Sequence, residues 1–451
     1  MRKIPLTREL IRLAGPIYIA QMAMMANGVI DTVMAGRLSV VDLAAVGIGA
    51  SIQVTIVMSL TGVLLALPPL IAHLYGADKH AAIGREIQQS VWIALVFGAI
   101  AILLLHYPWP FIALAELRPA VEAKVRAYLD ASAWGVPAAF AFRIFFGLFT
   151  GIGRPRVVMH FNLAALALKV PLNAVFMYGL AGLPALGGPG CAVATTVDAW
   201  LMALLAWAWC LRNPESAQLR LRQHWSRPDW QVIGPFLRLG LPIALTFIAD
   251  VSAFTFMAIF IARLGPVMSG AHQIAANLAA FAFILPLSIG NATAILAGRA
   301  LGAGQPQLAR KICGRGLALG LSLGIVVSLV FWFGAHTIAQ LYTADARVRA
   351  VAAPLIVLVG FYHLADVLQA VSVNALRGYK RSAIPMVIYT LGLWGVGLGG
   401  GVLLGLTHLL GPPRAAAGFW LAAVVSLWLV GGLVTWYLDQ VSRRALRSAT
   451  G

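Results

Sequence analysis

Charged residues are scarce in this sequence. Asp, Glu, Lys and Arg make up 11% of its 451 residues, whereas about a quarter of residues are charged in a typical soluble domain. Hydrophobic residues reach 61%, and the mean hydropathy is +0.87. This composition excludes an ordinary soluble protein and predicts an all-α polytopic membrane protein. At about 35 residues per helix and connection, the length holds about twelve or thirteen spans and no sizeable soluble domain.

The sequence also lacks the motifs of common enzyme and metal sites. Its three cysteines, Cys191, Cys210 and Cys313, share no CxxC spacing, so neither a disulfide framework nor a metal cluster is expected. HExxH and the P-loop pattern are absent, as is GxSxG in a strand–turn–helix context. We therefore expect neither an enzyme nor a bound cofactor.

Acidic residues are few compared with basic ones, 15 against 33, which gives a net charge of +18. Lys and Arg never form a block of five or six, so we expect no nucleic-acid partner. If the amino end is cytoplasmic, 23 of them fall on the inner side and 8 on the outer side. This distribution follows the positive-inside rule and predicts that both termini lie in the cytoplasm. The amino-terminal apolar segment has no cleavage site, so we expect it to be retained as the first helix.

Charges and Pro/Gly breaks divide the chain into twelve apolar segments. We expect helices near residues 11–36, 43–73, 88–107, 127–150, 157–180, 190–211, 236–262, 268–297, 313–337, 350–375, 384–409 and 416–438.

The two halves of the chain repeat each other. Aligning the second half on the first at one fixed offset places Arg12 on Arg238, Pro16 on Pro242 and Arg37 on Arg263. Arg and Pro at a fixed offset are difficult to explain by biased composition alone. We expect an amino-terminal six-helix lobe (1–211), a cytoplasmic linker (212–235) and a carboxy-terminal six-helix lobe (236–451). A pseudo-twofold axis along the membrane normal would relate the lobes, an architecture typical of secondary transporters.

Four acids lie inside apolar segments, where ionisable groups are costly and therefore candidates for function. They are Asp31, Asp198, Asp250 and Asp366. A carboxylate near the middle of a span can take up a proton, and two together can bind Na+. Asp31 could instead be an interfacial acid, and Asp198 a hydrogen-bonded packing residue.

Lys169 and Arg143 are the basic residues in similar positions. Lys169 can pair with Asp31 or Asp198, or extend its ammonium to the interface; pairing is the favoured interpretation. For Arg143 we expect a structural role.

Several polar residues of the second half are candidates for lining a cavity: Tyr362, Gln273, Asn277, His272, Asn291 and Asn374. Each could equally form an interhelical hydrogen bond. His363 and Asp366 have a metal-ligand spacing but no third ligand in the sequence, so we expect no metal site beyond Na+ at Asp250 and Asp366.

Four stretches of sequence resemble the multidrug and toxic compound extrusion (MATE) transporters, and most closely their NorM-like branch. They are IDTVMAGRLSVVDLAAVGIGASI from Ile30, PLNAVFMYG followed by ALGGPGCAVAT, PIALTFIADVSAF, and DVLQAVSVNALRGYKRSAIPM from Asp366. The resemblance covers essentially the whole chain.

The resemblance implies a twelve-helix antiporter that exports amphipathic, often cationic, drugs in exchange for Na+ or H+. By motif position Asp31 and Asp366 match the family's acids in the two lobes, and Asp250 stands where NorM-like members usually carry Glu. Asn173 matches the second Asn of the NxPLN motif, whereas Lys169 replaces the first. This substitution puts a fixed cation close to Asp31 and weakens an amino-lobe cation site.

Together these features predict a coupling-ion site at Asp366 and Asp250, with a second site at Asp31 that could accept a proton. The coupling ion stays open between Na+, slightly favoured, and H+. We expect drugs, toxic organic cations and the lipid bilayer as partners, and a functional monomer. The alternative is a lipid-linked saccharide flippase of the same superfamily. Its cavity would be cationic, whereas the deep acids here outnumber the deep basic residues four to two.

Overall fold

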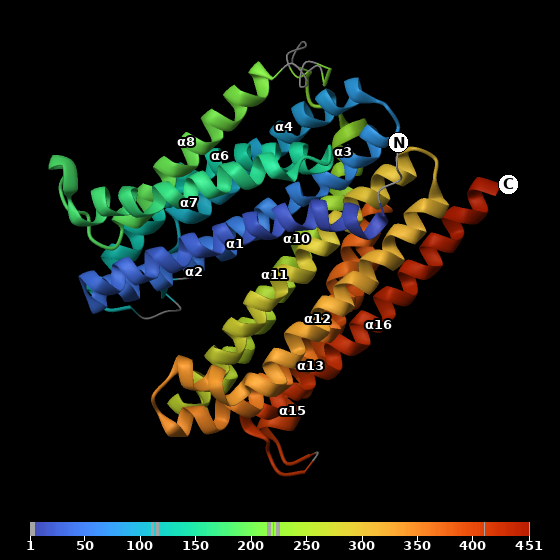
Figure 1. Cartoon of the computed structure of the whole chain (residues 1–451). Helices are drawn as coiled ribbons and strands as arrows, with labels where there is room; N and C mark the ends of the chain where they lie inside the picture. The colour runs from blue at the N-terminus through green and yellow to red at the C-terminus, as the bar shows by residue number, and fades with distance from the viewer. Residues whose placement is uncertain are drawn as a thin grey trace. The chain divides into compact units, whose positions relative to one another are not determined.

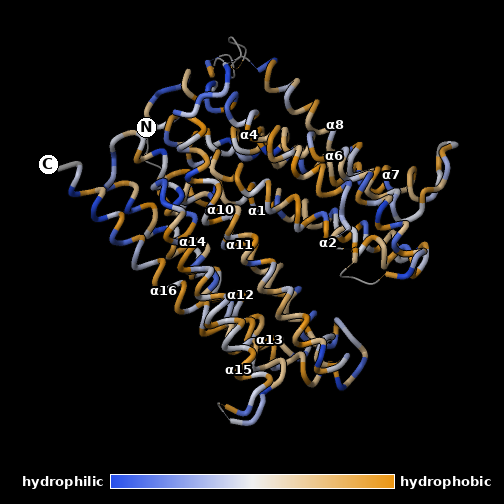
Figure 2. The backbone as a smooth tube through the Cα atoms, turned by 180° about the vertical axis from the view of Figure 1, so that it is seen from behind, coloured by the Kyte–Doolittle hydropathy of each residue, from blue (hydrophilic) through white to orange (hydrophobic). Residues whose placement is uncertain are grey.

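The computed structural model describes residues 5–109, 112–113, 117–213, 218–219, 221, 226–409 and 411–450. These residues form twelve helical spans that are long and apolar enough to cross a membrane, as predicted (Figure 1). Hydrophobic residues run along the helices and hydrophilic ones gather towards their ends (Figure 2).

Ten of the twelve spans are longer than the apolar segments expected from the sequence; the fifth has the same length, and the eleventh is slightly shorter. Their bounds are α1 Leu6–Leu38, α2 Val40–Thr61 continued by η1 Gly62–Ala66 and α3 Leu67–Gly76, α4 His80–His106, α6 Pro119–Gly151, α7 Pro155–Tyr178, α8 Gly190–Arg212, α10 Trp230–Ala262, α11 Pro266–Gly302, α12 Pro306–Tyr342, α13 Ala346–Gly378, α14 Ala383–Leu391 continued by the π-helix η3 Gly392–Gly399 and α15 Gly400–Leu406, and α16 Ala415–Thr450. A short 3₁₀ turn, η2 Leu180–Gly182, follows α7.

The helix starts follow local chemistry. Four spans begin with proline, at Pro119, Pro155, Pro266 and Pro306, where the missing N–H of proline would have no helical partner in any case. The span α10 begins at Trp230, inside the range expected to be linker, because the Asp229 carboxylate accepts a hydrogen bond (2.9 Å) from the Gln231 N–H and caps the helix.

The chain forms two compact units. The amino unit comprises residues 16–244, and the carboxy unit comprises residues 245–451 together with residues 1–15. The unit boundaries fall inside α1 and α10 rather than in the linker, so each of these two helices belongs partly to both units. Within the carboxy unit, α12, α13 and α16 run side by side (Figure 1).

Equivalent helices of the two units end in the same turn. After α3 and α11, Asp78 (φ 55°) and Gly304 (φ 69°) are left-handed, and the sequence repeat places these two residues on each other. After α6 and α13, Gly153 (φ 77°) and Lys380 (φ 58°) are left-handed, at an offset larger by one. A left-handed residue is a common way to end a helix. The sequence repeat is therefore also a repeat of backbone conformation.

Two equivalent glycines mark close helix packing inside each unit. A Cβ on Gly151 would lie 2.8 Å from the Pro68 carbonyl oxygen, and one on Gly378 would lie 2.7 Å from that of Ala294. The two glycines correspond in the repeat, and so do the residues that carry the two carbonyls. Small residues let membrane helices approach this closely. The contacts of α3 with α6 and of α11 with α13 are thus the same contact, formed once in each unit.

Candidate functional site

The amino unit contains a buried ion pair. The ammonium of Lys169 on α7 lies 2.9 Å from the Asp31 carboxylate on α1. Asn173, one helical turn after Lys169 and on the same face, donates a 2.7 Å hydrogen bond to that carboxylate. Lys169 is 1% exposed and Asn173 is fully buried. Because both groups are buried in apolar spans, the Lys169 ammonium and the Asp31 carboxylate depend on each other for electrostatic stabilisation.

The span α8 adds two polar residues to this pair. Lys169 donates a hydrogen bond to the Thr195 hydroxyl, which in turn donates one (2.8 Å) to the Cys191 carbonyl oxygen. Asp198 is 7% exposed, interacts electrostatically with Lys169, and has one carboxylate oxygen without a hydrogen-bond partner among the described residues. The ammonium therefore interacts with two carboxyl groups, and the direct ion pair is the one with Asp31.

The carboxy unit contains two acids that interact with each other. Asp250 lies on α10 and Asp366 on α13, and the two carboxylates interact electrostatically. Tyr389 on α14 donates a 2.5 Å hydrogen bond to Asp250. Asp366 is 5% exposed. Among the described residues, neither acid forms an ion pair with Lys, Arg or His. In this respect both differ from Asp31, which is paired with Lys169.

Two acids in such a position can hold a cation. Unpaired charges are costly in an apolar medium, so buried carboxylates take up protons or bind metal ions. Tyr362, one turn before Asp366 on α13, interacts electrostatically with both carboxylates and adds a phenol to the group. A monovalent cation or a proton bound here would remove part of the repulsion between the acids.

Aromatic and histidine side chains surround Tyr362. Its ring meets that of Trp420 edge to face at 5.8 Å, and the Trp420 ring lies 5.9 Å from that of His272. The indole nitrogen of Trp420 and Nδ1 of His272 are buried without hydrogen-bond partners in the described part of the chain. Trp420 was not among the sequence candidates, and its place in a long apolar run gave no signal.

The other candidates lie elsewhere or have local partners. Gln273 and Asn277 are exposed on α11 and bond to each other at 3.2 Å, so helices of their own unit do not cover them. His363 is buried with Asp366 on α13. No group of three or more potential metal-ligating His, Cys, Asp or Glu side chains occurs within the described ranges.

Tyr389 is the contact residue that the sequence analysis missed. Its hydroxyl is one of few polar groups in the span 383–406, and this isolation was the available signal. The Trp394 indole on the adjoining π-helix donates a 3.2 Å hydrogen bond to the Ala249 carbonyl, next to Asp250. Together these residues attach α14 and η3 to the acid-bearing turn of α10.

Comparison with known proteins agrees with this architecture. The MatE family model matches residues 16–175 and again residues 242–403. The second match starts at Pro242, the residue that the sequence repeat places on Pro16, where the first match starts. The family model therefore recognises the same repeat in the two halves of the chain.

Similar proteins are named for multidrug resistance. The chain is 38% identical to the "Probable multidrug resistance protein NorM" of Chromobacterium violaceum, covering 98% of this chain and 96% of the relative. It is 36% identical to "Multidrug resistance protein PmpM" of Pseudomonas aeruginosa, covering 98% and 92%. The fold is similar to that of the Vibrio cholerae MATE transporter VcmN in its bent form, with a TM-score of 0.82, 20% identity and 98% coverage of both chains.

Proposed function

This chain belongs to the MatE family, and we propose that it is a secondary active antiporter that exports amphipathic, often cationic, drugs in exchange for Na+ or H+. It is a multi-pass bacterial membrane protein and a transporter rather than an enzyme. The names of its relatives support multidrug efflux. The proposals for the exchange mechanism and the coupling ion are based on the charged residues within the spans of the two units.

The observation that carries the proposal is the pair of acids in the carboxy unit. Asp250 and Asp366 interact electrostatically, and neither has a basic partner among the described residues. A coupling ion and a cationic drug would compete for these carboxylates, and only a loaded site would allow the change between inward and outward states. Na+ is the favoured coupling ion because two carboxylates and nearby phenol oxygens form an oxygen-rich site.

The amino unit has a different role in this proposal. Lys169 already supplies a cation to Asp31, donates to Thr195 and interacts with Asp198. We infer that this tethered ammonium occupies the place that a second coupling ion would otherwise take. Coupling then depends on the carboxy unit, and Asp31 contributes by holding Lys169.

The membrane orientation follows from the basic residues. The side that carries most of the Lys and Arg is placed in the cytoplasm of the bacterial inner membrane, together with both termini. A monomer contains both units and is the proposed functional form.

The decisive experiment is drug efflux in inverted membrane vesicles with a Na+ gradient and a pH gradient imposed separately. One of the two gradients should drive ethidium transport in the wild type, and this gradient would identify the coupling ion. Asp366→Asn should lose at least about nine tenths of that transport at unchanged expression, because the substitution removes a charge that no other group replaces.

Asp345→Asn is the matched control. Asp345 is an acid at the start of α13 outside the span, where Asn caps a helix equally well. Wild-type transport by Asp366→Asn would contradict the proposed ion site. If neither gradient moves drug in inserted wild-type protein, the lipid-linked saccharide flippase becomes the better interpretation.

A further inference from the structure

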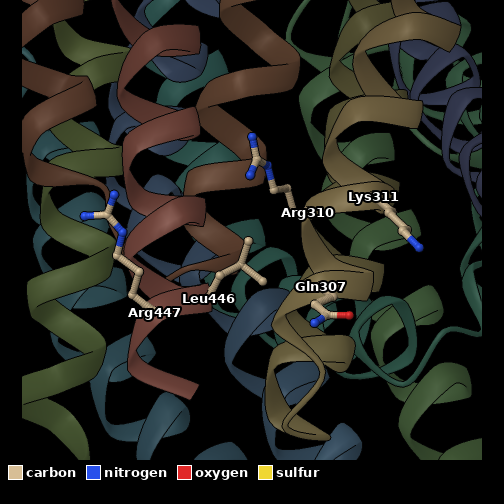
Figure 3. A pocket seen from close by; sticks show the side chains of 5 residues that line it. All are labelled: Gln307, Arg310, Lys311, Leu446 and Arg447. Carbon is tan, nitrogen blue, oxygen red and sulfur yellow. The ribbon is translucent and has the colours of Figure 1, made fainter. Parts of the chain in front are cut away.

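A pocket outside the carboxylate sites lies where the start of α12 meets the end of α16. Its volume is about 580 Å³, within the range of small-molecule sites. In Figure 3, Arg310 lies between the two helices, with Gln307 and Lys311 on α12 and Leu446 and Arg447 on α16. An adjoining pocket of about 490 Å³ shares Gln307, Lys311 and Leu446 and extends around the start of α12.

The pocket is strongly basic. Arg310, Lys311 and Arg447 line it, and Arg443 is close by on α16. An acid at this end of α16, Asp439, contacts Arg310 at 2.8 Å and Arg443 at 2.7 Å. One carboxylate thus orients two guanidinium groups but neutralises only one charge. Arg310, Arg443 and Lys311 thus carry three positive charges against this one carboxylate, and the excess favours an anionic ligand.

The pocket lies at the edge of the apolar belt. Residues 415–438 of α16 contain no charged residue, a length of about 36 Å that slightly exceeds the hydrocarbon core of a bilayer. Trp436, 62% exposed near the end of this run, has the position of an interfacial aromatic residue. Asp439 and the arginines that follow it therefore begin at the depth of lipid headgroups.

Helix direction brings the two sets of basic side chains into the same layer. The start of α12 meets the end of α16, so the helices are antiparallel. Side chains lean towards the amino end of their own helix, so Arg447 leans back towards the membrane while Arg310 leans away from it. Leu446 adds an apolar wall to the pocket. A ligand with a phosphate group next to a hydrophobic chain would match these basic side chains and the apolar wall.

We propose that this pocket binds the phosphate of an anionic phospholipid headgroup from the leaflet that faces the basic side of the protein. Arg310 supplies guanidinium donors between the two helices, and the Gln307 amide adds a neutral donor. Lys311 and Arg447, which point to opposite sides in Figure 3, add positive charge at the two flanks of the pocket. Basic pockets at helix ends on the cytoplasmic side are suited to such headgroups. Bound lipid would join the ends of α12 and α16.

The test uses purified full-length protein in a zwitterionic detergent micelle, titrated separately with dioctanoyl phosphatidylglycerol, dioctanoyl phosphatidylcholine and inorganic phosphate. The melting temperature reports binding, because a ligand of the folded state raises it. Phosphatidylglycerol should raise it in the wild type, whereas phosphatidylcholine should not. The double variant Lys311→Gln with Arg447→Gln should need about tenfold more phosphatidylglycerol for the same rise.

The matched control is Arg315→Gln with Arg444→Gln. It removes two charges from the same helices at positions that do not line the pocket. An equal loss in both double variants, or no response of the wild type, would overturn the proposal. An equal effect of inorganic phosphate would assign the pocket to soluble phosphate instead of lipid. If the double variant aggregates, Lys311→Gln alone should still shift the titration about threefold.

Discussion

At the scale of single residues, Lys169 distinguishes the carboxylate site of the amino unit from that of the carboxy unit. Asp31 has an ammonium at 2.9 Å, whereas Asp250 and Asp366 have no basic partner among the described residues. The ammonium is almost fully buried, so neither it nor Asp31 can rely on water for solvation. A change at either residue therefore affects the free energy of the other.

The first prediction concerns stability and needs no transport assay. Lys169→Met should lower the free energy of unfolding by about 3 kcal/mol or more, because it leaves the Asp31 carboxylate buried without its cation. Asp31→Asn in the same chain should recover at least half of the loss, because Asn carries no charge. Thermal unfolding of the two single variants and the double variant measures the coupling, and strictly additive losses would show that the pair does not act as a unit.

The sequence identified the charged residues of both sites but could not decide every contact between them. A charge in an apolar run is visible without a structure, and Asp31, Lys169 and Asp366 were recognised in this way. The rotation of each helix about its axis is not visible, so the sequence left open whether Lys169 meets Asp31 or Asp198. Tyr389 was missed because its role depends on α14 packing against α10.

At the scale of helices, close contacts are made by glycine. Gly378 lies where α13 meets α11, and a Cβ there would be 2.7 Å from a backbone carbonyl oxygen that cannot rotate away. Gly151 has the equivalent place in the amino unit. The two positions correspond in the sequence repeat, but only the structure shows that both face a neighbouring backbone.

The second prediction follows from this contact. Gly378→Ala should destabilise the protein by about 1–3 kcal/mol, because the two helices must separate to admit a methyl group. Gly314→Ala in α12 is the matched control, since its Cβ would have no neighbour within 4 Å, and alanine favours the helix by up to about 1 kcal/mol. Melting temperatures should therefore move in opposite directions, and a shared direction would argue against backbone contact as the cause.

A second contact between elements joins α4 to the end of the linker. Gln89 on α4 is fully buried; its amide donates to the Ser226 hydroxyl (2.8 Å) and the Arg227 carbonyl (3.0 Å), and accepts from the Asp229 N–H (2.8 Å). The sequence suggested only a polar connection, because a glutamine in an apolar helix does not reveal which distant segment it binds.

The third prediction tests this attachment. Gln89→Ala should speed tryptic cleavage between residues 212 and 229, because three hydrogen bonds to the segment are lost and local opening becomes easier. Gln231→Ala, an exposed position at the start of α10, is the control and should leave the rate unchanged. Fragment formation on gels provides the measurement, and equal rates for Gln89→Ala and the wild type would show that other contacts hold the linker.

At the scale of the whole molecule, the fold was predictable and the charge balance of its units was not. Twelve apolar runs and an internal repeat follow directly from hydropathy and spacing, and both recur in the structure. The ion pair depends on contacts between α1, α7 and α8, which hydropathy does not reveal. Among the residues that the structure describes, the amino site has two acids and one fixed cation, whereas the carboxy site has two acids and no basic partner.

The last prediction uses this difference to count ions. If Na+ is the coupling ion, purified wild-type protein should bind one Na+, Asp366→Asn should bind none, and Lys169→Asn should bind two, because removal of the tethered ammonium exposes Asp31 and Asp198 to the solution ion. Equilibrium binding of radioactive Na+ gives the stoichiometry directly. Saturation at about 100 times the dissociation constant should also stabilise the folded wild type by about 2.7 kcal/mol. Two ions bound to the wild type would show that Lys169 does not replace one. If H+ is the coupling ion instead, the number of protons that the protein exchanges should rank in the same way: lowest for Asp366→Asn, intermediate for the wild type and highest for Lys169→Asn.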